Sequence, residues 1–250
     1  MKLNVKSGPF IKSNVTKQKI ELTILISLII MNLYRILVDG ILPIFYLVSV
    51  FVPLFISSVI YDSISKRQIR LLNYINVIIS SLITTLLIPI NSNYILILIL
   101  TFVTGIIGKF LKVNEISLNL SLILIFNNPT MTNYNIYIFS LLLILSIVAL
   151  IKNRALKFRI SLIYILVLIL SFILKSIDIN RIFMLLLIGV YVIPYFKSSP
   201  NTSTVQYMYG LILGIIGAFA NYNVLYISIT LLSIVFIYID FYNSYLLSRK

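Results

Sequence analysis

Residues 71–111 read LLNYINVIISSLITTLLIPINSNYILILILTFVTGIIGKFL and contain two apolar runs, Leu71–Ile90 and Tyr94–Leu111. A helix that crosses the hydrocarbon layer of a bilayer, about 30 Å thick, needs about 20 predominantly apolar residues. Both runs approach this length, and Pro89 and Asn91 mark the turn between them because proline interrupts a helix. The stretch therefore predicts two neighbouring membrane-spanning helices.

The same pattern extends through the whole chain of 250 residues. Ten apolar segments follow one another with short polar connections: Ile20–Val38, Ile41–Tyr61, Leu71–Ile90, Tyr94–Leu111, Ile116–Met131, Tyr134–Ile151, Ile160–Leu174, Ile182–Phe196, Tyr207–Ala220 and Val224–Tyr242. They lack the alternation of polar and apolar residues that a transmembrane β-strand requires. The predicted fold class is therefore all-α: a polytopic membrane protein of about ten transmembrane helices, forming one transmembrane domain over residues 1–250.

Composition separates this chain from soluble proteins and from several cofactor classes. Hydrophobic residues make up 60% of the chain and charged residues 10%, whereas about a quarter of the residues of a soluble protein are charged. Cysteine, histidine and tryptophan are absent. The sequence thus offers no thiolate or imidazole ligands for haem, an Fe–S cluster or zinc. The expected partner is the lipid bilayer, and not nucleic acid.

The net charge of +14 is interpreted as a topology signal. Lys and Arg collect in the short cytoplasmic loops of membrane proteins, and all but three of the 20 basic residues fall on one side of a ten-segment count. The exceptions are Arg35, Lys175 and Arg181. Residues 1–19 are expected to be a cytoplasmic basic tail, with both termini in the cytoplasm. High usage of Ile, Asn and Lys is typical of an AT-rich bacterial genome, so the expected location is the bacterial inner (cytoplasmic) membrane.

The ten segments divide into two sets of five. In each set a proline-flanked turn follows the third segment, at Pro89 in the first set and at Pro194 in the second. With five spans in a set, the second copy enters the membrane from the opposite side. This pattern is typical of an inverted repeat, and it predicts a first half over residues 20–133 and a second half over residues 134–250.

Charged residues inside predicted spans are candidates for function because they cost free energy in lipid. Four of them lie near the ends of segments: Arg35 and Asp39, which are four residues apart, Lys109 and Asp240. These residues either line an ion path or act as structural anchors that reach toward the headgroups, and anchoring is the favoured interpretation. Asp178 and Arg181, in a predicted outer loop, form a second expected ion pair.

Polar residues also interrupt the fifth segment. Asn114, Glu115 and Asn119 precede an apolar core of only Leu120–Phe126, and Asn127-Asn128-Pro129 follows it. Such a short piece is typical of a broken or tilted helix that builds a site near the middle of a membrane. A short helix that ends at a proline and is buried among its neighbours is the equal alternative.

Several motifs in collinear order carry a resemblance to a known family. They are Ser7-Gly8-Pro9-Phe10 before the first span, Asn73 to Pro89 in the third, Gly108-Lys109-Phe110-Leu111 ending the fourth, Lys157-Phe158-Arg159 entering the seventh, Pro200-x-Thr202 and Tyr209-Gly210 at the ninth, and Ile239-Asp240-Phe241-Tyr242 near the C-terminus. On these residues the chain resembles the D subunit of the Rnf electron-transport complex and the similar B subunit of the sodium-translocating NADH:quinone reductase. The resemblance implies the same ten-span fold and other membrane subunits of an electron-transport complex as partners.

The departures from that family concern the flavin. The Ser-x-Ala-Thr motif, whose threonine carries FMN in the family, occurs nowhere in this chain, and the predicted loop Asn127–Asn133 is too short to hold it. Covalent FMN is therefore not expected. The resemblance still permits a non-covalent flavin, either riboflavin or FMN, and the candidate binding residues are Asn114, Asn119 and Thr202.

These observations favour a divergent integral-membrane subunit of an Rnf-like ion-translocating electron-transport complex. The alternatives are a small-solute or ion transporter or channel on the same repeat, and a scaffold without a site of its own. An independent enzyme acting on a soluble substrate is not expected, because the 6 acidic residues fall on different segments or loops and no catalytic constellation forms.

Overall fold

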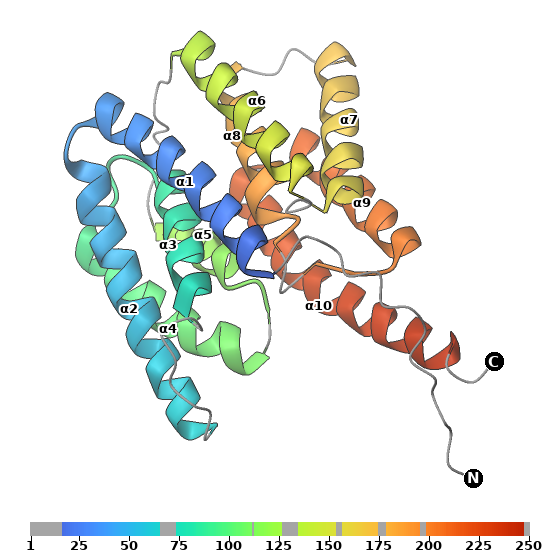
Figure 1. Cartoon of the computed structure of the whole chain (residues 1–250), viewed down its shortest axis with the longest axis horizontal. Coiled ribbons are helices and arrows are strands. Elements are labelled where there is room, and N and C mark those ends of the chain that lie inside the picture. The colour runs from blue at the N-terminus through green and yellow to red at the C-terminus, as the bar shows by residue number, and fades with distance from the viewer. Residues whose placement is uncertain are drawn as a thin grey trace.

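The computed structural model describes residues 17–65, 74–111, 113–126, 135–153, 157–174, 179–195 and 199–247. Every regular element in these ranges is a helix (Figure 1). The elements are α1 (Lys17–Asp39), α2 (Leu42–Ile64), α3 (Ile75–Leu87), α4 (Tyr94–Leu111), α5 (Glu115–Phe126), α6 (Ile136–Lys152), α7 (Phe158–Leu174), α8 (Ile179–Leu187), the π-helix η2 (Ile188–Val192), α9 (Ser203–Phe219) and α10 (Tyr222–Leu247). The all-α prediction is confirmed for this part of the chain.

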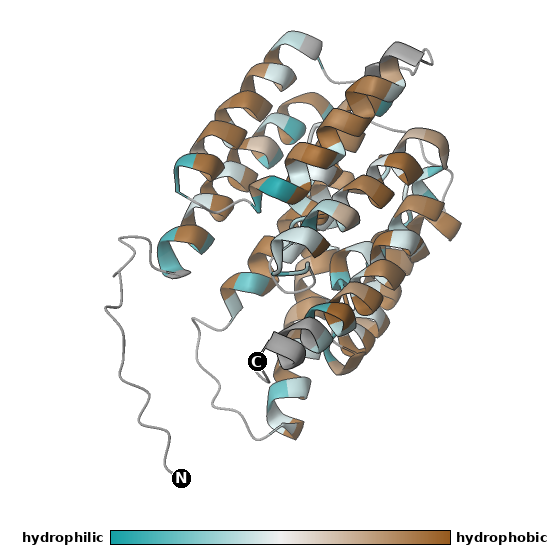
Figure 2. Cartoon of the chain, turned by 90° about the vertical axis from the view of Figure 1, so that its right-hand side faces the viewer, coloured by the Kyte–Doolittle hydropathy of each residue, from teal (hydrophilic) through white to brown (hydrophobic). Residues whose placement is uncertain are grey.

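Four helices are long and apolar enough to cross a bilayer. They cover Gln18–Asp39, Leu42–Ile64, Tyr94–Leu111 and Tyr222–Asp240, and the remaining helices are apolar but shorter. Apolar residues colour most of the length of the helices in Figure 2. Many of them, such as Leu37 on α1 at 83% exposure, face outward. The protein is a multi-pass membrane protein whose outer surface suits hydrocarbon.

Two short helical pieces form the interior of the bundle. In α3 and the turn after it, every residue from Ile79 to Pro89 is buried, and the same holds from Leu187 to Tyr195, through η2. A helix that is apolar on all faces is expected to be surrounded by others. The hydroxyls of Thr84 and Thr85 in α3 bond to carbonyls of their own helix, at 2.8 and 2.7 Å, which is how buried hydroxyls are satisfied within a helix.

Close helix contacts in both parts of the chain depend on glycine. Helix α4 packs on α2, and α9 packs on α7. A Cβ atom at Gly210 of α9 would lie 2.7 Å from the carbonyl oxygen of Ile160 in α7, and one at Gly108 of α4 would lie 2.9 Å from the Cβ atom of Glu115 in α5. Small residues at these crossings let the backbones approach, as in other membrane helix pairs.

Two further contacts join the first five helices to the last five. Helix α1 packs on α6, and α5 packs on α10. In Figure 1 the helices of residues 17–126 lie mainly on the left and those of residues 135–247 mainly on the right. The described helices agree with the predicted segments in order and number, but three of the pieces are short: α5 has 12 residues, α3 has 13 and α8 has 9 before η2 continues it.

Short helices matter because some of their ends lie inside the bundle: the C-terminal end of α3 and the N-terminal end of α5 are buried. The last four carbonyls of a helix have no partner within it, and a buried backbone group without a partner costs free energy. Polar side chains that bond to these helix ends are therefore the first candidates for a role in the structure or the site.

Candidate functional site

Arg35 of α1 closes the C-terminal end of α3. Its guanidinium donates to the carbonyl of Ile88 at 2.6 Å and to the carbonyl of Thr85, and its Nε lies 3.0 Å from the Asp39 carboxylate. Pro89 follows directly and lacks an N–H, so α3 cannot continue. A cation at this position also complements the negative end of the helix dipole.

The ion pair between Arg35 and Asp39 agrees with the sequence prediction, but its surroundings do not match a surface anchor. The Arg35 side chain is 0% exposed and is therefore enclosed by other protein groups. Asn32, one turn earlier on α1, donates its amide to the carbonyl of Leu82 in α3 at 3.2 Å. Asn32 was not among the predicted site residues, because these contacts span about 50 residues, which local spacing cannot reveal.

Arg181 bonds to the C-terminal end of α9 in a similar way. Its guanidinium donates to the carbonyl of Ala220, the residue that ends the helix, at 2.6 Å. It also lies 5.9 Å from the centre of the Tyr222 ring, which is cation–π range. The predicted partner Asp178 lies outside the described residues. Arg181, like Arg35, thus bonds to a carbonyl at the C-terminal end of another helix.

Lys109 links α4 to α2. Its amine donates to the Ser58 hydroxyl, and Ser58 in turn donates to the carbonyl of Leu54 in its own helix at 2.7 Å. The Lys109 side chain is half-buried. The structure places it at a helix contact, beside the close approach of Gly108 to α5.

Asn114 joins the start of α5 to the π-helix. Its side-chain oxygen accepts from the N–H groups of Ile116 and Ser117, both at 3.2 Å, which is an N-cap geometry. Its side-chain amide donates to the carbonyl of Val192 in η2, also at 3.2 Å. Asn114 is 0% exposed, and its side chain bonds both to the start of α5 and to η2.

The remainder of α5 carries two more buried polar contacts. The Asn119 amide donates to the Thr101 hydroxyl of α4 at 3.0 Å. The Ser117 and Thr230 hydroxyls lie 2.8 Å apart, across the contact between α5 and α10. Of the two predicted alternatives for this segment, the described part fits a short helix buried among neighbours, and its polar groups bond to other protein groups.

Thr202 and Asp240 come together, although 38 residues separate them. The Asp240 carboxylate accepts from the N–H groups of Asn201 and Thr202 at 2.7 and 3.0 Å, and from the Thr202 hydroxyl at 2.5 Å. The carboxylate therefore fixes the connection that leads into α9.

Lys157 holds the same connection from its other side. Its amine donates to the carbonyls of Ser199 and Pro200 at 2.8 and 3.2 Å, and to the side-chain oxygen of Asn201 at 3.1 Å. Burial lowers the pKa of Lys157 to about 8, and the nearby carboxylate of Asp240 opposes this shift. Sequence analysis noted Lys157 only as part of a basic turn, because its position before α7 gives no sign of this contact.

The candidate residues thus fall into separate groups. Arg35 and Asp39 of α1 lie beside the C-terminal end of α3. Asn114 caps α5 and Asn119 lies on it, whereas Asp240 of α10 bonds to Thr202 at the start of α9. Among the described residues no group of three or more acidic, histidine or cysteine side chains could hold a metal ion. What these groups have in common is that each bonds to another helix or connection of the bundle.

We predict that Asn114→Ala lowers the free energy of unfolding more than Asn114→Ser does. Serine keeps an oxygen that can cap α5, whereas alanine removes the cap. Both variants leave the Val192 carbonyl without its donor. Loss of a cap costs about 0.5–2 kcal/mol and an orphaned buried carbonyl about 1–3 kcal/mol. Thermal unfolding in detergent measures both. Equal stability of both variants and the wild type would contradict the role assigned to Asn114.

We predict that Asp240→Ala speeds amide hydrogen exchange at residues 199–206, because the N–H groups of Asn201 and Thr202 lose their acceptor. Thr202→Val is expected to give a smaller increase and Thr202→Ser none, since serine keeps the hydroxyl. Tyr238→Phe, at a side chain that is 71% exposed on α10, is the control. Hydrogen exchange followed by mass spectrometry provides the measurement; unchanged exchange in Asp240→Ala would contradict the proposed contact.

Comparison with known proteins adds one match. The family model described as NQR2, RnfD, RnfE family matches residues 4–112. The match confirms over this range the resemblance that the motifs indicated, and it covers α1 to α4. No curated protein matches the chain. The motifs at Lys157, Pro200 and Ile239 lie beyond the matched residues.

Proposed function

We propose that this multi-pass membrane protein, which matches the NQR2, RnfD, RnfE family over residues 4–112, is a divergent subunit of an Rnf-like ion-translocating electron-transport complex. The family match is the observation that carries the proposal. Other membrane subunits of the complex supply the redox centres. The chain lies in the bacterial cytoplasmic membrane, crosses it ten times and has both termini in the cytoplasm.

We further propose that residues 20–133 and 134–250 are inverted copies of one five-helix unit. Three features support this. The second and fourth helices of each set pack together, as α2 with α4 and α7 with α9. Glycines three residues apart occur late in each fourth helix, at Gly105 and Gly108 and at Gly214 and Gly217. The buried third helix of each set leads into a proline, Pro89 or Pro194.

A flavin does not fit the candidate residues. Some members of the family bind FMN, but this chain lacks the Ser-x-Ala-Thr motif. The side chains of Asn114, Asn119 and Thr202 bond to Val192, Thr101 and Asp240. Each side chain already makes a contact between parts of the bundle, so none of the three needs a flavin to satisfy it. We therefore derive no electron-transfer step through the described residues and propose that the chain supports the complex by holding partner subunits and shaping an ion path.

Lys109, Asp240 and the pair Arg35–Asp39 remain the candidates for that ion path. Each is bonded within the protein, and so each would act by setting the positions of helices as well as by its charge. Substitutions can distinguish the two roles. Replacing a residue with a structural role lowers the stability of the protein, whereas replacing an ion ligand lowers ion flux and leaves stability unchanged.

The second candidate is a small-solute or ion transporter that uses the same repeat and needs no cofactor. The observation that favours it is the engagement of all three candidate flavin ligands by protein groups. A scaffold without a site of its own is the third.

Purification of the tagged chain from its native membrane separates these proposals. We expect redox subunits to copurify with the chain and no flavin to remain covalently attached to it after acid denaturation. We also expect membrane electron transport to fall when the chain is deleted and to return when the wild-type copy is restored. Deletion that leaves electron transport unchanged, together with solute or ion flux into liposomes that contain the chain alone, would contradict the proposal and support the transporter.

A further inference from the structure

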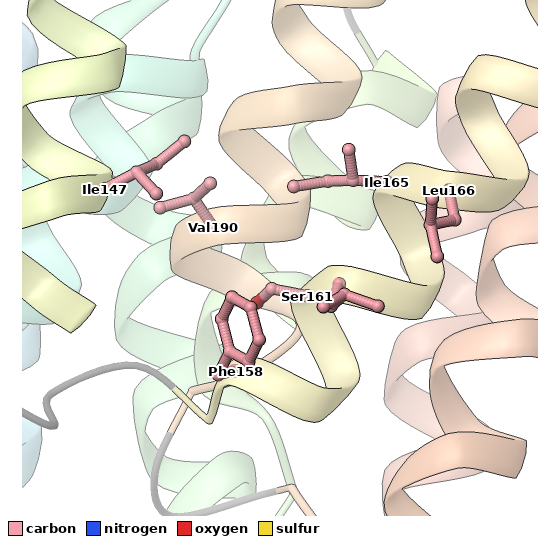
Figure 3. Close-up of a pocket in the computed structure, with 7 residues that line it drawn as sticks. Ile147, Phe158, Ser161, Ile165, Leu166 and Val190 are labelled. Atoms are coloured by element: carbon pink, nitrogen blue, oxygen red, sulfur yellow. The ribbon is translucent and has the colours of Figure 1, made fainter.

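An apolar pocket of about 210 Å³ lies between α6, α7 and η2. Figure 3 shows the side chains that line it: Ile147 from α6, Val190 from η2, and Phe158, Ser161, Ile165 and Leu166 from α7. None of these residues belongs to the polar groups at the helix ends. The pocket is therefore independent of the candidate site described above.

The pocket exists because α6 and α7 diverge. Helix α6 packs on α1, whereas α7 packs on α9, and the two helices stand apart in Figure 1. The wall of the pocket is apolar except for the hydroxyl of Ser161. This hydroxyl donates to the carbonyl of Gly189 at 2.8 Å. Water needs two to four polar partners in a cavity, so the space suits a hydrocarbon chain better than water.

The pocket opens sideways toward the lipid. Phe158 is 47% exposed and Leu166 is 50% exposed, and both lie on the outer surface of a membrane-spanning bundle. The molecules that touch this surface in the membrane are phospholipids. An acyl chain can therefore enter the pocket directly from the bilayer.

Two basic residues follow or adjoin lining residues at the facing ends of α6 and α7. Helix α6 ends at Lys152, and α7 begins at Phe158, which lines the pocket, followed by Arg159. Lys152 and Arg159 are both exposed. The guanidinium of Arg159 lies 6.0 Å from the centre of the Tyr207 ring of α9, which is within cation–π range. Basic residues at the ends of membrane helices bind anionic lipid headgroups.

We infer that this pocket binds one acyl chain of an anionic phospholipid, whose phosphate lies at Lys152 and Arg159. The apolar wall takes the chain, and the two cations at the membrane surface select the headgroup. The inference is independent of the proposed role in electron transport, because it depends only on the pocket, its exposure to lipid and the charges beside it.

The absence of tryptophan from the chain makes a direct test possible. Phe158→Trp places the single tryptophan of the chain in the pocket wall, where its emission can be excited apart from that of the tyrosines. Brominated phospholipids quench a tryptophan that they touch. We expect brominated phosphatidylglycerol to quench this variant at a mole fraction about tenfold lower than brominated phosphatidylcholine, since two nearby cations favour an anionic headgroup. Addition of Lys152→Gln and Arg159→Gln is expected to remove the preference.

Phe110→Trp is the matched control. Phe110 is 52% exposed at the end of α4. The preceding residue, Lys109, bonds to Ser58 through its amine. We expect both brominated lipids to quench the tryptophan of this variant equally. Helical content by circular dichroism shows whether each variant is folded. Equal quenching of Phe158→Trp by the two lipids overturns the inference, and so does a preference that survives the two glutamine substitutions. Displacement of brominated lipid by a long-chain quinone, but not by unbrominated phosphatidylglycerol, also overturns it.

Discussion

The bundle depends on hydrogen bonds to helix ends that lie away from water. Within a membrane each backbone N–H and C=O group must find its partner in the protein. The C-terminal end of α3 and the N-terminal end of α5 are buried among other helices. Arg35 meets this requirement for the carbonyls of Thr85 and Ile88, and Asn114 meets it for the first N–H groups of α5. Without such partners the interior helices could not be short.

The same requirement explains how much could be predicted from the sequence. Apolar runs and proline-flanked turns predicted the order of the helices, because hydropathy and helix termination are local properties. The ends were less accurate: the predicted segment Ile182–Phe196 corresponds to α8 and η2, which together run from Ile179 to Val192. Spacing predicted the ion pair of Arg35 with Asp39 but not its burial, because the carbonyls that Arg35 bonds are about 50 residues away.

The candidate cofactor residues show a second limit of sequence reasoning. A buried asparagine or threonine in a membrane helix costs free energy unless it is bonded, so its presence indicates a partner but not whether that partner is a ligand or the protein. For Asn114, Asn119 and Thr202 the partners are Val192, Thr101 and Asp240. The family match covers residues 4–112, whereas these three residues and two of their partners, Val192 and Asp240, lie beyond it.

Buried polar side chains hold helix ends in place in this protein, and a substitution at Arg35 tests this role most directly. In Arg35→Gln the carbonyl of Ile88 loses a charged donor and Asp39 loses its ion-pair partner, which for a buried pair costs about 3–5 kcal/mol. Thermal unfolding in detergent, together with hydrogen exchange at residues 82–92, is the measurement. We predict a lower unfolding midpoint and faster exchange there. Unchanged stability and exchange, with loss of ion flux alone, would contradict the account and assign Arg35 to an ion path.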